Sequence, residues 1–131
     1  MRPRLAHVAA AVATIAVGLA VHLGGVVLGP VARDVLGDAL WAMMIAWWIG
    51  ALAPDARLVR RGASALAVCF AVEASQRLHA PWLDAVRGTT IGHLVLGSGF
   101  DPRDFLSYTA GVVAAMLIER ATRRPRRPRS Q

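Results

Sequence analysis

The sequence predicts an all-α integral membrane protein, a bundle of four spanning helices with a short interfacial or re-entrant helix between the third and the fourth. The chain has 131 residues, of which 56% are apolar and only eight are acidic. A soluble protein of this size has too small a core to bury that much apolar surface. A lipid bilayer is therefore the better solvent for these residues. The apolar residues also gather in four runs, and arginines gather between those runs on one side.

The first two runs cover about residues 5–28 and 36–53. At about 1.5 Å per residue, the first run can cross roughly 30 Å of hydrocarbon with some tilt. It ends in Gly29-Pro30 rather than in the small-residue cleavage site of a secretory signal, so we expect an uncleaved helix. Asp38 falls in the first turn of the second run, where the helix dipole favours an acid. It is either a helix-start acid or part of a site.

The third and fourth runs cover about residues 63–78 and 103–118. Small residues recur every four positions in both, at Ala63, Ala67, Ala71 and Ser75, and at Ser107, Gly111 and Ala115. This spacing lets two helices approach closely in lipid, so we expect these two to pack together. Between them, Thr89-Thr90 precedes an apolar run at 91–96 that is too short to span, which predicts the short helix with a threonine cap.

The arginines predict the orientation. All fifteen basic residues are arginine, and the net charge is +7. Eleven of them lie in the N-terminal head, in the turn at 55–62 and after Glu119, against four on the other side. By the positive-inside rule, this is a multi-pass protein of the cell membrane with both termini cytoplasmic.

The charge excess belongs to a tail. Residues 1–119 form the predicted membrane domain, and residues 120–131 are rich in arginine and proline, so we expect them to be disordered. Such a tail is attracted to anionic lipids of the inner leaflet. Because the excess is confined to the tail, the charge does not indicate nucleic-acid binding.

On this topology, polar residues from three helices and the segment before the fourth converge at the outer end of the bundle. They are Asp38, Glu73, Gln76, Arg87, Asp104 and Tyr108, with His22 nearby. Ionisable groups beside apolar segments are costly, which makes a group of them a candidate site. A second interpretation stays open, in which these groups pair with one another and close the end of the bundle.

Such a cluster could serve acid-base chemistry, a divalent ion or a polar headgroup. The sequence has no nucleophile motif, no His-rich metal spacing and no phosphate-binding glycine loop, so it assigns no catalytic residue, and we predict no metal and no cofactor. Cys69, alone in an apolar run, is expected to be structural. The leading hypothesis is a binder of a lipid headgroup or cell-envelope precursor. The alternatives are an enzyme acting on such a lipid and a small scaffold or transport accessory subunit.

Several motifs in order resemble one bacterial family. They are Gly37-Asp38-Ala-Leu-Trp41-Ala42, Glu73-Ala-Ser-Gln76, Pro81-Trp82-Leu83 with Arg87, and Gly97-Ser-Gly-Phe100 with Asp104, Tyr108 and Gly111. These resemble the domain of unknown function 2809 family of uncharacterised membrane proteins. The same pattern is similar, more distantly, to the VanZ-like proteins, although Tyr108 stands where those proteins have Asn. The resemblance implies a membrane protein and supplies no mechanism.

Overall fold

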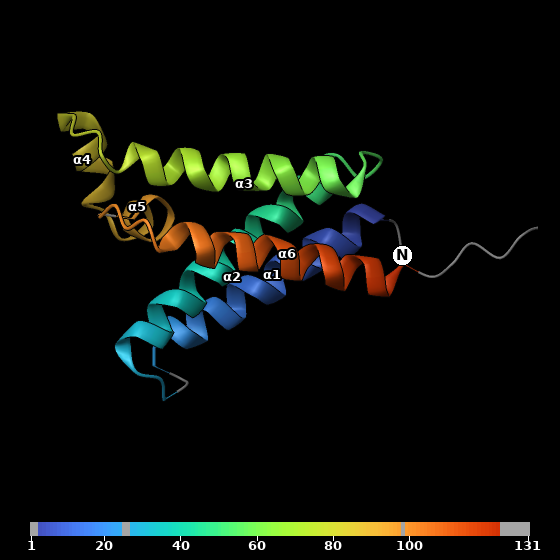
Figure 1. Cartoon of the computed structure of the whole chain (residues 1–131). Coiled ribbons are helices and arrows are strands. Elements are labelled where there is room, and N and C mark those ends of the chain that lie inside the picture. The colour runs from blue at the N-terminus through green and yellow to red at the C-terminus, as the bar shows by residue number, and fades with distance from the viewer. Residues whose placement is uncertain (1–2, 25–26, 98, 124–131) are drawn as a thin grey trace, which may run out of the picture.

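The computed structural model describes residues 3–24, 27–97 and 99–123, and these residues form six helices and no strand. In chain order the helices are α1 (Pro3–His22), α2 (Pro30–Leu52), α3 (Leu58–Ser75), α4 (Pro81–Arg87), α5 (Thr90–Leu96) and α6 (Asp104–Thr122). Four are long and two are short, as Figure 1 shows. The predicted all-α class is therefore confirmed.

The four long helices form one bundle with α2 as its central member. α2 packs against α1, α3 and α6, and α3 also packs against α6. The short helices α4 and α5 lie where α3 finishes and α6 begins (Figure 1). The start of α1, the turn from α2 to α3 and the end of α6 lie at the opposite end (Figure 1). We call these the α4–α5 end and the α2–α3 turn end.

Small side chains and a few aromatic ones fill the core between these helices. One buried cluster joins Ala42 of α2, Ala65 and Cys69 of α3, and Tyr108 and Val112 of α6. A second joins Ala11, Trp47 and Ala115 from α1, α2 and α6. Small residues at such contacts let helix backbones approach closely. Cys69 is fully buried in the first cluster, in keeping with the structural role expected of it.

Two helices of the described part, α1 and α2, are long and apolar enough to cross a membrane by length and composition. Both lie near the N-terminus, and little of either apolar window is buried inside the protein. The structure thus confirms the helical fold and gives two candidate spans, and it does not confirm the predicted bundle of four membrane-spanning helices. That α3 and α6 also span remains a proposal.

The second run starts earlier than predicted. α2 begins at Pro30 rather than near residue 36, with Gly29 before it in an extended conformation. Proline suits the first turn of a helix, because its missing N–H has no partner there in any case. Arg33 and Asp34 are therefore helical, and Asp38 lies about two turns inside α2 rather than in its first turn. The interpretation of Asp38 as a helix-start acid was wrong.

Other boundaries shifted for local reasons. α1 ends at His22 instead of Leu28, and Gly24 follows with a φ of 79°, a conformation that glycine favours and that commonly ends helices. α3 begins at Leu58, so Arg61 lies inside the helix and not in the preceding turn. α6 continues to Thr122, so the first residues of the predicted tail are helical, and residues 124–131 lie outside the described part.

The segment between α3 and α6 holds two short helices where one was predicted. α5 matches the expected helix, and Thr89 caps it, as expected, by accepting a hydrogen bond from the Gly92 N–H at 3.0 Å. α4 was not predicted. Pro81 in its first turn is a helix-start signal that the sequence prediction did not use.

The packing of α3 and α6 is confirmed, but the predicted contact face of α3 was wrong. Ala63, Ala67 and Ala71 are exposed, whereas the buried face carries Arg61, Gly62, Ala65, Cys69 and Glu73. The α6 stripe is buried as predicted, yet Gly111 faces the backbone of Ala39 in α2 rather than α3. The charged residues at the two ends of the buried α3 face find partners inside the bundle, and these partners orient the helix.

Candidate functional site

Glu73 lies at the centre of the polar cluster at the α4–α5 end. Its side chain is fully buried. Oε2 accepts hydrogen bonds from the Tyr108 hydroxyl at 2.9 Å and from Gln76 Nε2 at 3.1 Å. Oε1 accepts one from the backbone N–H of Asp101 at 2.8 Å. One carboxylate thus ties α3 to α6 and to the segment that precedes α6.

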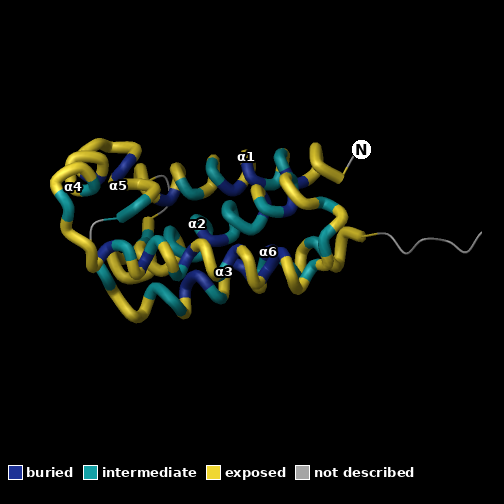
Figure 2. The backbone as a smooth tube through the Cα atoms, turned by 90° about the horizontal axis from the view of Figure 1, so that it is seen from above, coloured by how far each residue is buried: buried dark blue, intermediate teal, exposed yellow. Residues whose placement is uncertain are grey.

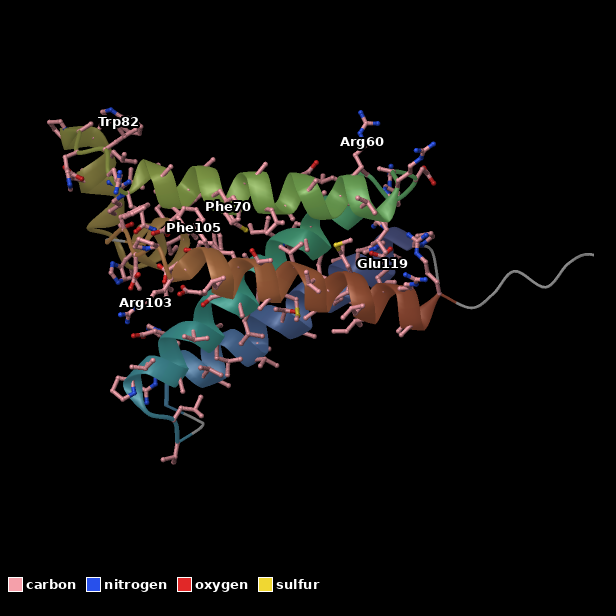
Figure 3. All side chains as sticks on the ribbon, viewed as in Figure 1. Arg60, Phe70, Trp82, Arg103, Phe105 and Glu119 are labelled. Atoms are coloured by element: carbon pink, nitrogen blue, oxygen red, sulfur yellow. The ribbon has the colours of Figure 1, made fainter. Side chains whose placement is uncertain are left out.

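Aromatic packing supports this junction. Phe70 of α3 and Phe105 of α6 meet edge to face with ring centroids 4.7 Å apart (Figure 3). The ring of Trp41 in α2 lies 5.5 Å from that of Tyr108. A buried carboxylate that accepts three hydrogen bonds is fully satisfied, so Glu73 acts as a structural tie. For this part of the cluster, this supports the interpretation in which the polar groups pair with one another and close the end of the bundle.

Asp38 of α2 and Asp104 of α6 behave differently from Glu73. Their carboxyl groups are neighbours, close enough to share a hydrogen bond when one is protonated. Both side chains are half-buried, and no donor among the described residues hydrogen-bonds to either. Two such carboxylates repel each other when both are ionised, so a shared proton or a bound cation stabilises the pair. We call them the acid pair.

Two buried polar atoms, one beside Asp38 on α2 and one on a side chain bonded to Glu73, also lack partners within the described part of the chain. They are the indole N–H of Trp41, three residues after Asp38 on α2, and Oε1 of Gln76. A buried polar group without a partner costs free energy, so such groups commonly have a water or a ligand nearby. A donor and an acceptor therefore accompany the two carboxylates.

Arg87 does not join this cluster, although it was predicted with it. Its guanidinium donates to the carbonyl oxygens of Leu78 at 2.8 Å and Ser75 at 2.6 Å, and it lies 3.4 Å from Asp84 Oδ1. Arg87 therefore fastens α4 to the end of α3. His22 lies near Arg87, on the wall of a separate cleft. The structure brings together Asp38, Glu73, Gln76, Asp104 and Tyr108.

A second buried polar network lies at the α2–α3 turn end, and the sequence prediction missed it. Arg61 of α3 donates to Glu119 of α6 and lies 3.0 Å from Nε2 of His7 in α1. His7 Nε2 is in turn 3.2 Å from Glu119 Oε1. Gly50 of α2 leaves space for the His7 ring, because a Cβ at that position would overlap the ring. Glu119 marks this end in Figure 3.

A signal for this network was present in the sequence. Arg61, Ala65, Cys69 and Glu73 follow one another at four-residue spacing, so they share one face of α3. Since Glu73 was predicted to meet polar residues of other helices, Arg61 on the same face of α3 is expected to face those helices too. Among the described residues, no group of three His, Cys, Asp or Glu side chains could hold a metal ion.

Fold and site define a class, a small all-α protein with apolar N-terminal helices and a carboxylate-rich cluster at one end of its bundle. Residues 27–112 match the family described as "Protein of unknown function (DUF2809)". The match spans more than half of the chain, and the chain belongs to this family. The matched range, residues 27–112, includes every residue of the polar cluster. The more distant similarity to VanZ-like proteins stays a prediction from the motifs. No solved structure matches the chain.

Proposed function

We propose that this protein is a multi-pass membrane protein that binds the polar headgroup of a lipid or cell-envelope precursor at the α4–α5 end. The acid pair carries the proposal. Two neighbouring carboxylates from different helices, without donors from the described residues, suit a cationic group such as the ammonium of a headgroup. Glu73, by contrast, holds α3 and α6 in the arrangement that brings Asp104 to Asp38.

The distribution of side chains supports the membrane part of the proposal. Polar and charged groups are buried inside the bundle, while many large apolar side chains are exposed, including Val17, Leu52, Val59, Leu106 and Leu117. Exposed residues recur along α1, α3 and α6 and lie toward both ends of α2 (Figure 2). Extensive exposed apolar surface marks a contact with a membrane or another protein.

The charge distribution supports an orientation with the α4–α5 end outside. Arg57 lies in the turn from α2 to α3, Arg60 and Arg61 lie at the start of α3, and more arginines follow Glu119, so the basic side of the chain is the α2–α3 turn end. Cytoplasmic loops carry such an excess. In this orientation the acid pair faces the outer leaflet. Arginines after Glu119 face the inner leaflet, where each contributes about 1 kcal/mol to binding anionic lipids.

The test compares lipid binding by native mass spectrometry of the protein in nanodiscs. The site variant is the double substitution Asp38→Asn with Asp104→Asn, which keeps the shape of both side chains. The control is Asp34→Asn with Asp101→Asn, which removes the same charge from two exposed acids at the same end. The probe is phosphatidylethanolamine, whose headgroup carries an ammonium.

We expect the site variant to bind phosphatidylethanolamine about tenfold more weakly than the wild type, since a charge-assisted hydrogen bond contributes roughly 1.5–3 kcal/mol. The control should bind like the wild type. Equal binding by all three forms would rule out the acid pair as a headgroup site. Conversion of the bound lipid by the wild type alone would favour the enzyme alternative.

A further inference from the structure

A cleft at the α4–α5 end lies apart from the acid pair and has the opposite chemistry. Its volume is about 390 Å³, within the range of roughly 300–1,000 Å³ that small-molecule sites occupy. It lies between the end of α1 and the α4–α5 segment, with His22 on one side and Arg87, Thr90 and His93 on the other. None of its lining residues is a carboxylate.

The lining side chains offer hydrogen-bond donors to a ligand. His22, Thr90 and His93 are exposed, and none has a hydrogen-bond partner within the described part of the chain. A hydroxyl and two imidazoles in this state are free to bind a group inside the cleft. Thr89 is already occupied, since its hydroxyl donates to the Val86 carbonyl and accepts from Gly92.

Arg87 supplies the fixed positive charge of the cleft. Its side chain is only 8% exposed, and its two terminal nitrogens are held by the backbone of Leu78 and Ser75. Its Nε–H is buried without a partner. The nearest carboxylate, Asp84, is 3.4 Å away and half-exposed, so solvent weakens its compensation of the charge. An arginine held so rigidly favours an anion beside it.

We propose that this cleft is the anion subsite of the same ligand, and that it binds a phosphate group. This inference rests on the proposed function and deepens it. The acid pair takes the ammonium and the cleft takes the phosphate, so the ligand class is a zwitterionic phospho-headgroup. The two sites lie at one end of the bundle, because Arg87 binds the carbonyl of Ser75, the residue before Gln76 of the cluster.

The test uses the full-length protein in nanodiscs, with the double substitution His22→Ala and His93→Ala. Both side chains are exposed, so the fold does not depend on them. His79→Ala is the matched control, because His79 is a highly exposed imidazole in the segment joining α3 to α4 but does not line the cleft. Thr90→Val is a second variant that removes a donor without changing charge.

Two probes separate the sources of the phosphate. Phosphatidylglycerol carries a phosphate but no ammonium, and inorganic phosphate carries no lipid chain. We expect the double variant to bind phosphatidylglycerol about tenfold more weakly, with a smaller loss for Thr90→Val and none for His79→Ala. If inorganic phosphate competes with the lipid in the wild type, the cleft recognises free phosphate too. If it does not compete, the cleft recognises phosphate only as part of a headgroup.

Unchanged phosphatidylglycerol binding in the double variant and in Thr90→Val would overturn the anion subsite. That outcome differs from failure of the proposed function. The acid-pair variant Asp38→Asn with Asp104→Asn should still bind phosphatidylglycerol, and it should lose only the preference for phosphatidylethanolamine. If the acid-pair variant keeps that preference, the proposed function fails whatever the cleft does.

Discussion

At the scale of single residues, the carboxylates of this end of the bundle divide into two kinds. Glu73 is fully buried and accepts hydrogen bonds from Tyr108, Gln76 and the backbone of Asp101. Asp38 and Asp104 are half-buried neighbours. A buried acid with several donors stabilises the fold, whereas neighbouring acids without donors cost free energy until a cation or a proton joins them. The same residue chemistry therefore serves structure in one place and, in the function proposed above, binding in the other.

The first prediction concerns Glu73. Glu73→Ala leaves three donors without their acceptor, so it should lower the free energy of unfolding by about 3 kcal/mol or more. Tyr108→Phe removes only one of these hydrogen bonds and should cost about 1 kcal/mol. The measurement is equilibrium unfolding in detergent micelles. If Glu73→Ala costs no more than Tyr108→Phe, Glu73 is not the tie between α3 and α6.

At the scale of elements, glycines decide how closely the helices approach. A Cβ on Gly111 of α6 would overlap the carbonyl oxygen of Ala39 in α2. Gly62 of α3 faces Met116 of α6 in the same way, although that partner is a flexible side chain. A backbone atom cannot move aside alone, so the contact of α6 with α2 is more sensitive to an added side chain than the contact of α3 with α6. The same contact carries Asp104 toward Asp38.

The second prediction tests this contact. Gly111→Ala should push α6 away from α2 and destabilise the protein by about 1–3 kcal/mol, as overpacking does. Gly18→Ala in α1 is the matched control, because a Cβ there meets nothing within 4 Å. Alanine favours a helix over glycine by up to about 1 kcal/mol, so the control should be neutral or slightly stabilising. Thermal unfolding of both variants in one detergent measures the difference. Equal stability of the two variants would contradict the close contact.

At the scale of the whole molecule, polar groups are gathered at the two ends of an otherwise apolar bundle. The network of His7, Arg61 and Glu119 occupies the α2–α3 turn end, and the cluster around Glu73 occupies the other. Between them the core is made of apolar side chains, most of them small. This layering fits the proposed membrane setting, because polar groups are tolerated near the surfaces of a bilayer and costly at its centre.

The third prediction concerns this layering and its direction. On a Cys69→Ser background, Trp82→Cys in α4 should react with a membrane-impermeant thiol reagent added to intact cells. Arg57→Cys in the turn before α3 should react only after the membrane is opened. Both positions are exposed in the protein, so differences in labelling report the side of the membrane. Labelling of Arg57→Cys in intact cells would reverse or refute the proposed topology.

The sequence by itself determined the helical class, the approximate positions of the four long helices, the threonine cap of α5 and the family. These follow from composition, apolar run length and local motifs, which act within a few residues along the chain. Sequence also placed Glu73, Gln76, Tyr108, Asp38 and Asp104 in one cluster, because the ends of adjacent antiparallel helices meet whatever the details of their packing.

Only the tertiary structure decided which face of α3 is buried, that Arg87 belongs to a different cleft, and that Arg61 meets His7 and Glu119. In a helix as rich in small residues as α3, small-residue stripes occur on more than one face, so spacing alone left the rotation of α3 open. The choice was made by partners far apart in sequence. Burying Glu73 and Arg61 is favourable only where Tyr108 and Glu119 are present to receive them, and those contacts exist only in the assembled bundle.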